Sequence, residues 1–168
     1  MGNDHEERLM PGVSRKRDRR IRLDLDDQEA QIMRELVREM NTLLEADLPR
    51  ADPVVARLFP DAYEDEGESD TYRELIGDQL HDAKRSALRH VKESLGDEGP
   101  VALTLVPESA EEWLRVLNDL RLAIGTRLEI DDDRMSADVD PKDPDAQALL
   151  LLHWLGWTQE LLVEAVDR

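Results

Sequence analysis

The chain has 168 residues, which is the size of one domain with a buried core, and 37% of them are charged. Its formal net charge of −18 argues against nucleic-acid binding by the main body, because affinity for phosphates rests on cationic contacts, whereas an acidic surface suits basic protein partners. The absence of cysteine excludes a disulfide framework, a thiolate metal site and a thiol redox switch within this chain.

The N-terminal segment, residues 1–19, is predicted to be a flexible basic tail that precedes a single helical domain of residues 20–168. A basic run, RKRDRRIR at residues 15–22, holds six basic residues and one acidic residue. We favour a solvated arm, or one that lies against the acidic body, over an arm that binds nucleic acid. The chain shows no signal peptide and no apolar run of the roughly 18 residues that a membrane span needs, so we expect a cytoplasmic protein.

Two short segments alternate apolar and polar residues, which is the pattern of a half-buried strand. They are RIRLDL at residues 20–25 and VALTL at residues 101–105. Two strands do not form a stable sheet alone, so we expect them to pair as a small ribbon against helices.

Five helices are predicted from apolar residues at three- and four-residue spacing and from their capping patterns. They follow Asp26, which forms a capping-box pattern with Glu29, then Asp52-Pro53, Ser69, Val106 and Asp143-Pro144. The acidic segments 61–70 and 131–143 are predicted to be solvated connections. The fold class is therefore mostly α, a bundle of about five helices with a small two-stranded β-ribbon.

The fourth helix contains LNDLRLAIGTRL, residues 117–128, which places charged residues in an apolar pattern. At 100° per residue, Arg121 and Arg127 fall inside the apolar face, while Asn118 and Gly125 lie on its border. A buried guanidinium needs acceptors, because an unpaired buried charge is very costly.

The last helix offers such acceptors and is apolar around most of its circumference, which predicts a central position in the bundle. We expect Gly125 and Gly156 to mark a close crossing of the two helices, where the arginines form ion pairs with glutamates. The alternative is a pocket for an anionic ligand. The candidate structural or ligand-contact residues are Asn118, Arg121, Arg127, His153, Glu160 and Glu164.

No catalytic, cofactor or metal site is predicted. His81 lies at helical spacing from Asp78 and Asp82, but ion pairing with nearby arginines explains this group. Segment 131–143 lacks the glycine and glutamate of a calcium loop, and no nucleophile elbow or phosphate-binding loop is present. We therefore expect no cofactor and no enzymatic activity.

Five segments carry a family resemblance: RIRLDLD, ARLFPDAY, KRSALRHV, EEWLRVLNDLRLAIGTRLEI and LLHWLGWTQELLVEAV. With them, residues 20–167 resemble an actinobacterial family of domains of unknown function, number two thousand and seventeen. The family includes the actinomycete oxidative stress regulator, which is described as working with a sigma factor. Its sensing is attributed to an N-terminal Cys-x-x-x-Cys pair, and this chain has no cysteine to carry that role.

The resemblance thus implies a regulatory, protein-binding role in a stress response. We expect a non-enzymatic regulator that contacts a sigma factor or RNA polymerase, and self-association is left open. One alternative is an interaction module of ClpS-dependent proteolysis, since members of the family are typically encoded beside the ClpS adaptor. The other alternative is an enzyme that binds an anionic ligand at the helix face that carries Arg121 and Arg127.

Overall fold

The computed structural model describes residues 10–49, 51–60 and 70–168, so residues 1–9 of the predicted N-terminal tail lie outside the described residues. The predicted mostly-α class is confirmed, with six helices and three strands in the described residues. In chain order they are β1 (Gly12–Arg15), β2 (Ile21–Leu25), α1 (Asp27–Glu45), α2 (Pro53–Leu58), α4 (Asp70–Leu95), β3 (Val101–Leu105), α5 (Pro107–Arg127), α6 (Asp132–Ser136) and α7 (Ala146–Asp167).

The three strands form one antiparallel sheet in the order β1-β2-β3. The alternation in β2 places Ile21, Leu23 and Leu25 in the core, where each is at most 2% exposed. The predicted two-stranded ribbon is incomplete, since β1 adds a third strand inside the segment assigned to the tail. That strand has one apolar residue, Val13, and no alternation of its own, so backbone pairing with β2 defines it and a side-chain pattern cannot reveal it.

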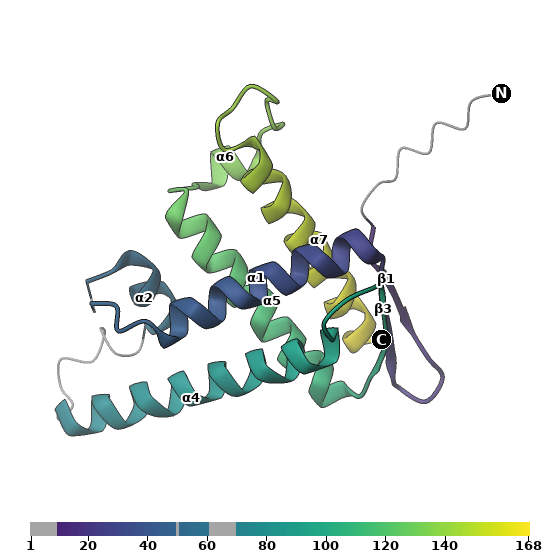
Figure 1. Ribbon diagram of the computed structural model, residues 1–168, viewed down its shortest axis with the longest axis horizontal. Helices are drawn as coiled ribbons and strands as arrows, with labels where there is room; N and C mark the ends of the chain where they lie inside the picture. Colours follow the sequence, from purple (N-terminus) through teal and green to yellow (C-terminus); the bar gives the residue numbers. More distant parts are fainter. Residues whose placement is uncertain (1–9, 50, 61–69) are drawn as a thin grey trace.

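Helix α5 is the central helix of the bundle. It packs against α1, α2, α4 and α7, and Figure 1 shows α1 crossing over it while α7 runs alongside. The expectation that the last helix is central was wrong, because α7 packs mainly against α5 and β1 and leaves Leu150, Trp157 and Val163 exposed. An apolar circumference alone does not separate a central helix from one with an apolar solvent-facing side.

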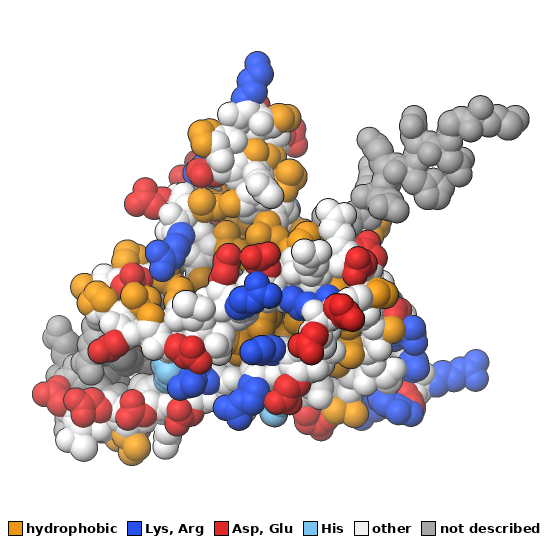
Figure 2. All heavy atoms as spheres, viewed as in Figure 1, with side chains coloured by type: hydrophobic (Ala, Val, Ile, Leu, Met, Phe, Trp, Pro, Cys, Tyr) orange, Lys and Arg blue, Asp and Glu red, His pale blue; other side chains and the backbone are white. Residues whose placement is uncertain are grey.

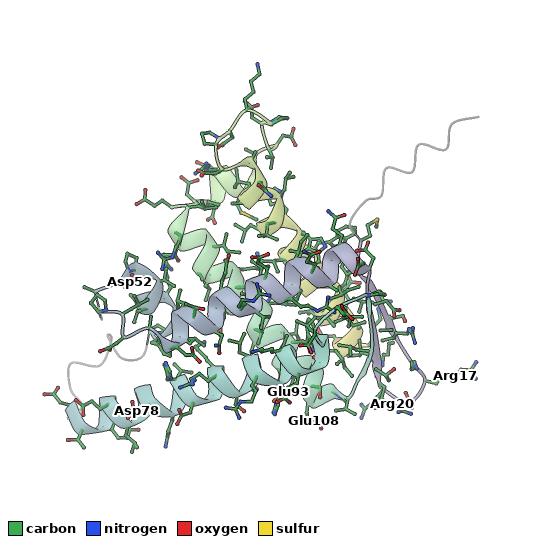
Figure 3. The ribbon with its side chains drawn as sticks, viewed as in Figure 1. Arg17, Arg20, Asp52, Asp78, Glu93 and Glu108 are labelled. Carbon is green, nitrogen blue, oxygen red and sulfur yellow. The ribbon has the colours of Figure 1, made fainter. Side chains whose placement is uncertain are left out.

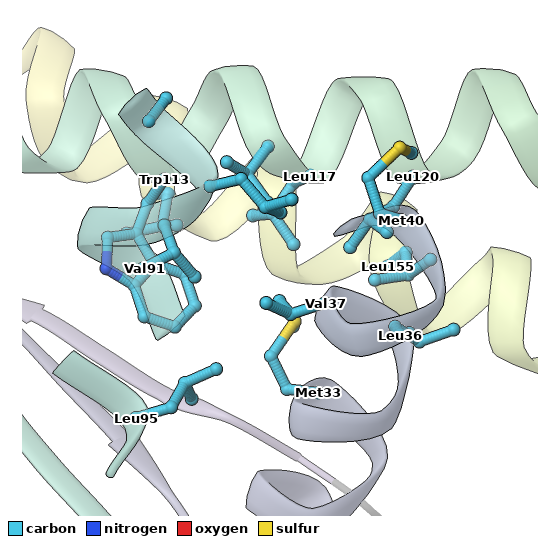
Figure 4. Packing of buried hydrophobic residues seen from close by; sticks show 14 of the residues in the cluster. Met33, Leu36, Val37, Met40, Val91, Leu95, Trp113, Leu117, Leu120 and Leu155 are labelled. Carbon is cyan, nitrogen blue, oxygen red and sulfur yellow. The ribbon is translucent and has the colours of Figure 1, made fainter. Parts of the chain in front are cut away.

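The core gathers side chains from α1, α4 and α5 (Figure 4). Trp113 and Leu117 of α5 meet Met33 and Val37 of α1 and Val91 of α4, and each of these is at most 2% exposed. Burial of one such side chain stabilises the fold by about 1.5–3 kcal/mol. This core fixes the positions of α1 and α5, which form two walls of the candidate site.

Two predicted helix starts are confirmed by their capping bonds. The Asp26 carboxylate accepts the backbone N–H of Glu29 at 2.8 Å, and the Glu29 carboxylate accepts the N–H of Asp26 at 2.9 Å, which completes the capping box of α1. Asp52 accepts the N–H of Val54 at 2.8 Å and caps α2.

The predicted start of the last helix is wrong by two residues. Helix α7 begins at Ala146, and Asp145 at its cap position makes no side-chain capping bond. Asp143 accepts the backbone N–H of Asp145 at 2.8 Å and pairs with Arg134 at 3.2 Å. This aspartate therefore braces the preceding turn instead of opening the helix.

Of the two predicted connections, residues 131–143 contain the short helix α6. The carboxylate of Asp131 accepts the backbone N–H of Arg134 at 2.8 Å and so caps the first turn of α6. Sequence reasoning missed this capping aspartate. The acidic segment 61–70 lies outside the described residues except for Asp70, which begins α4.

Candidate functional site

An apolar groove of about 450 Å³ lies between the C-terminal halves of α1 and α5 and the start of α7. Figure 2 shows hydrophobic side chains at the surface above α1, where the arm made by α5, α6 and α7 rises from the bundle. The groove exists because α1 ends at Glu45, while α5 continues outward to α6 and the chain returns along α7. Its apolar walls are made by Leu36, Met40, Leu43, Ala46, Leu48, Leu120, Ala123, Ile124, Leu128 and Ala148.

The outer end of this arm, residues 128–146, is acidic. It holds eight acidic and two basic residues, and one of the basic residues, Arg134, forms ion pairs within the same segment. Its guanidinium contacts Asp145 at 2.8 Å and Asp143 at 3.2 Å and donates to the carbonyl oxygen of Leu128 at 3.2 Å. The backbone N–H of Asp145, with this guanidinium, lowers the pKa of Asp143. The apolar groove is thus bordered by a braced, negatively charged arm.

The two arginines of α5 lie in different environments. Arg127 lines the rim of the groove and is exposed. Arg121 lies over α7, where its Nη1 donates to Oε1 of Gln159 at 2.7 Å, and a Cβ built on Gly156 would lie 3.5 Å from its guanidinium. The arginine side chain therefore lies directly over Gly156. A Cβ on Gly125 would meet nothing within 4 Å, so the predicted close crossing at that glycine was wrong.

The expected ion pairs between α5 and α7 were also wrong. Within the part of the chain that the structure describes, neither Arg121 nor Arg127 pairs with a carboxylate of α7. The Arg121 guanidinium has the neutral amide of Gln159 as an acceptor, its buried Nε has no hydrogen-bond partner among the described residues, and Glu160 and Glu164 are exposed at the surface. Arg121 and both glutamates nevertheless line one shallow hollow of about 560 Å³.

The remaining candidates, His153 and Asn118, lie elsewhere. His153 Nε2 lies 3.1 Å from the carbonyl oxygen of Met135, and this bond ties α7 to α6. Asn118 is exposed on α5. The six residues chosen from the sequence thus divide between the groove rim, the hollow on α7, the α6 contact and open surface, and they do not form one site.

Sequence reasoning missed the strongest polar contact of α5. The helix angle points Asp119 away from the apolar face, but α4 covers that side, and Asp119 Oδ1 lies 2.7 Å from Nζ of Lys84. Lys84 also lies 5.9 Å from the ring centroid of Phe59, on which His81 stacks. Burial raises the pKa of Asp119, and the lysine opposes this shift. The burial of Asp119 could have been predicted only by knowing that other helices cover α5 on two sides.

His81 itself has a structural partner in place of the metal that its aspartate neighbours suggest. Its Nε2 lies 2.9 Å from the carbonyl oxygen of Leu44, at the end of α1. Among the described residues, no group of three or more histidine, aspartate or glutamate side chains is arranged to hold a metal ion.

A sequence profile of a domain of unknown function, DUF2017, matches residues 10–166. The chain belongs to the DUF2017 family. The match spans the sheet, the groove and the arm, so all of these are features of the DUF2017 domain. It confirms the family expected from the five segments.

Relatives of this DUF2017 chain have regulatory names. It is 35% identical over 130 residues to the "Putative oxidative stress regulator AosR" of Mycobacterium leprae, which covers 68% of this chain and 58% of that protein. It is 29% identical over 154 residues to the "Oxidative stress regulator AosR" of Mycobacterium bovis and of Mycobacterium tuberculosis, which covers 83% of this chain and 70% of each relative. The chain thus spans little more than half the length of the first relative.

No solved structure matches this DUF2017 chain. Among the described helices, none is both long and apolar enough to cross a membrane.

Proposed function

We propose that this DUF2017 protein is a non-enzymatic stress regulator that acts by binding another protein, and that its partner is a sigma factor of RNA polymerase. The names of its relatives support a regulatory role. The family resemblance supports the choice of a sigma factor as the partner, because the actinomycete oxidative stress regulator is described as working with one. The observation that carries a protein-binding mechanism is the apolar groove between α1, α5 and α7.

The groove suits one amphipathic helix of the partner. Its walls come from three helices and are almost entirely apolar, with Glu39, Thr42 and Arg127 as the polar side chains on its lining. A helix that docks in such a groove inserts apolar side chains spaced three, four and seven residues apart. The neighbouring acidic arm favours a partner helix that carries lysine or arginine beside its apolar face, because opposite charges speed encounter and fix orientation.

Thiol sensing is not part of this proposal, because the chain has no cysteine. Regulation by this protein then depends on its amount, or on a change in the partner, rather than on a disulfide in this chain. We expect its affinity for the partner to be the same in reducing and oxidising buffer.

The test is a binding titration of the full chain against purified sigma factors from the same cell, with Leu43→Ser as the groove variant. Leu43 is a partly exposed wall of the groove, so losing its apolar contact should weaken binding more than tenfold. The matched control is L75S, because Leu75 lies on α4 outside the groove and is 55% exposed.

Thermal unfolding of both variants checks that the fold is intact. Equal binding by wild type and L43S, or no binding to any sigma factor, would contradict the proposal. Binding to purified ClpS in place of a sigma factor would support the proteolysis alternative.

A further inference from the structure

The hairpin formed by β1 and β2 projects beyond the helices, and its tip is the basic run seen in the sequence (Figure 1). The turn is closed by the N–H of Lys16, which donates to the carbonyl oxygen of Arg20 at 2.8 Å. Asp18 braces it from within, since its carboxylate accepts the Arg20 side chain at 2.6 Å and the Arg20 backbone N–H at 3.2 Å. The tip is therefore an ordered loop that holds its cations in fixed positions.

Four of the six cations in residues 15–22 have no carboxylate partner among the described residues. One of them, Arg15, is partly buried at the end of β1, and the other three lie at the tip. Arg20 and Arg22 are paired with Asp18 and Asp24, but Lys16 contacts only the neutral hydroxyl of Thr104, at 3.5 Å. The other two are Arg17, whose side chain points away from the protein in Figure 3, and Arg19. The tip therefore carries free positive charge on a protein whose net charge is −18.

Arg19 occupies a conformation that favours glycine. Its φ is +66°, in the left-handed region, which costs a residue with a side chain of order 1 kcal/mol. Glycine would adopt this turn without strain. Arg19 is exposed, and within the part of the chain that the structure describes its side chain forms no hydrogen bond or ion pair that offsets the strain, so this side chain points to a role outside the fold.

We propose that the β1–β2 hairpin binds the phosphate backbone of duplex DNA through Lys16, Arg17 and Arg19. The proposal goes beyond the protein-binding function and is independent of what occupies the groove.

Duplex DNA fits the chemistry of this tip better than other polyanions do. A guanidinium matches phosphate geometry with paired donors, and a two-stranded ribbon is narrow enough to enter a DNA groove. The outer sheet face, which carries Ser14, Arg22 and Thr104, has no aromatic ring on which single-stranded bases could stack. Residues 16–20 include no apolar side chain that could insert into a lipid surface.

The acidic body limits this contact to the hairpin. Charges more than about 8 Å away are largely screened at physiological ionic strength, so the tip can meet DNA while the rest of the surface avoids it. Three phosphate contacts predict weak affinity that falls with salt, with a slope of log K against log salt of about −2 to −3. A partner that is itself bound to the same DNA would raise the effective concentration of the hairpin there.

The test measures fluorescence anisotropy of a labelled mixed-sequence duplex of about 20 base pairs with the full chain, between about 50 and 200 mM NaCl. The variant is R17Q/R19G, in which glycine relieves the strain at position 19, so the fold should be at least as stable. We expect affinity to drop more than tenfold at the lowest salt and the salt slope to shrink by about 2. The charge-matched control, R57Q/R89Q, removes two exposed arginines from α2 and α4 and should bind as wild type does.

Three outcomes would overturn the inference: no duplex binding by wild type at the lowest salt, equal binding by R17Q/R19G, or equally tight binding of wild type to anionic vesicles. Self-association at low salt that R17Q/R19G abolishes would also overturn it, since the hairpin would then bind the acidic surface of a second copy. Because L43S and R17Q/R19G alter separate surfaces, loss of DNA binding with intact sigma-factor binding, or the reverse, separates this inference from the proposed function.

Discussion

Nζ of Lys84 lies 2.7 Å from Oδ1 of Asp119, and the two side chains are only 16% and 11% exposed. This contact is a buried polar link between α4 and the central helix α5, and it lies under Phe59 of the α2 segment. Because the pair is largely removed from water, either partner alone would be left as an uncompensated charge.

We therefore predict that Lys84→Met destabilises the fold by about 3 kcal/mol at neutral pH, because it leaves the Asp119 carboxylate buried without its cation. Burial already raises the pKa of Asp119, so the loss should become smaller in mild acid, where the carboxyl takes up a proton. Urea unfolding at both pH values measures this. As a control, E111Q breaks the exposed pair of Glu111 and Arg115 and should change stability by less than about 0.5 kcal/mol. If K84M lowers the free energy of unfolding by the same amount at both pH values, the buried Asp119 charge is not the cause of the loss.

The contrast between Asp119 and Arg121 shows how far the sequence could predict this fold. Capping residues, strand alternation and helix periodicity are local, and they located every long helix and two of the three strands. Which side of a helix is covered depends on residues far away in the chain. The helix angle of Asp119 points it away from the apolar face of α5, but α4 covers that side, so this charged residue is buried.

The candidate site shows the same division. Arg121 or Arg127 was expected to pair with Glu160 or Glu164. Arg121 does line one hollow with both glutamates, but its acceptor is Gln159, because the side of α7 that meets α5 is set by packing between the helices and not by the angles within one helix. The groove was not predicted at all, because its walls are apolar residues that look like core in the sequence. These wall residues stay uncovered because α1 ends at Glu45, whereas α5 continues beyond that point.

The two glycines of the α5 and α7 interiors give a second prediction. Gly125→Ala should raise the free energy of unfolding by about 0.5–1 kcal/mol, since alanine is the better helix former and its Cβ would meet nothing within 4 Å. Gly156→Ala should raise it by a similar amount, because its Cβ would lie 3.5 Å from the Arg121 guanidinium, which is an ordinary van der Waals contact. Thermal or urea unfolding of the two variants measures both changes. A destabilising G125A would restore the close helix crossing that the structure argues against.

Glu29 gives a prediction about pH. It is 1% exposed, its Oε2 accepts the capping bond of α1, and its Oε1 has no hydrogen-bond partner among the described residues. Burial raises its pKa above the ordinary value of 4.5, although the backbone N–H of Asp26, which the carboxylate accepts, opposes the shift. The folded protein therefore holds this proton more tightly than the unfolded chain does. The stabilisation that Glu29 contributes is full below the unfolded pKa and is lost as pH rises through the raised folded pKa.

The matching variant is Glu29→Gln, which keeps a side-chain acceptor for the N–H of Asp26 and removes the titration. We expect stability of wild type relative to E29Q to fall as pH rises from below 4.5 through the raised pKa and then to become constant. Taking this difference cancels the other carboxylates, such as Asp18, whose side-chain bond to Arg20 lowers its pKa and gives the opposite slope. Urea unfolding of both proteins at several pH values provides the measurement. A difference that does not change with pH, or that rises with pH, would show that the Glu29 carboxyl is stabilised in its charged form inside the fold.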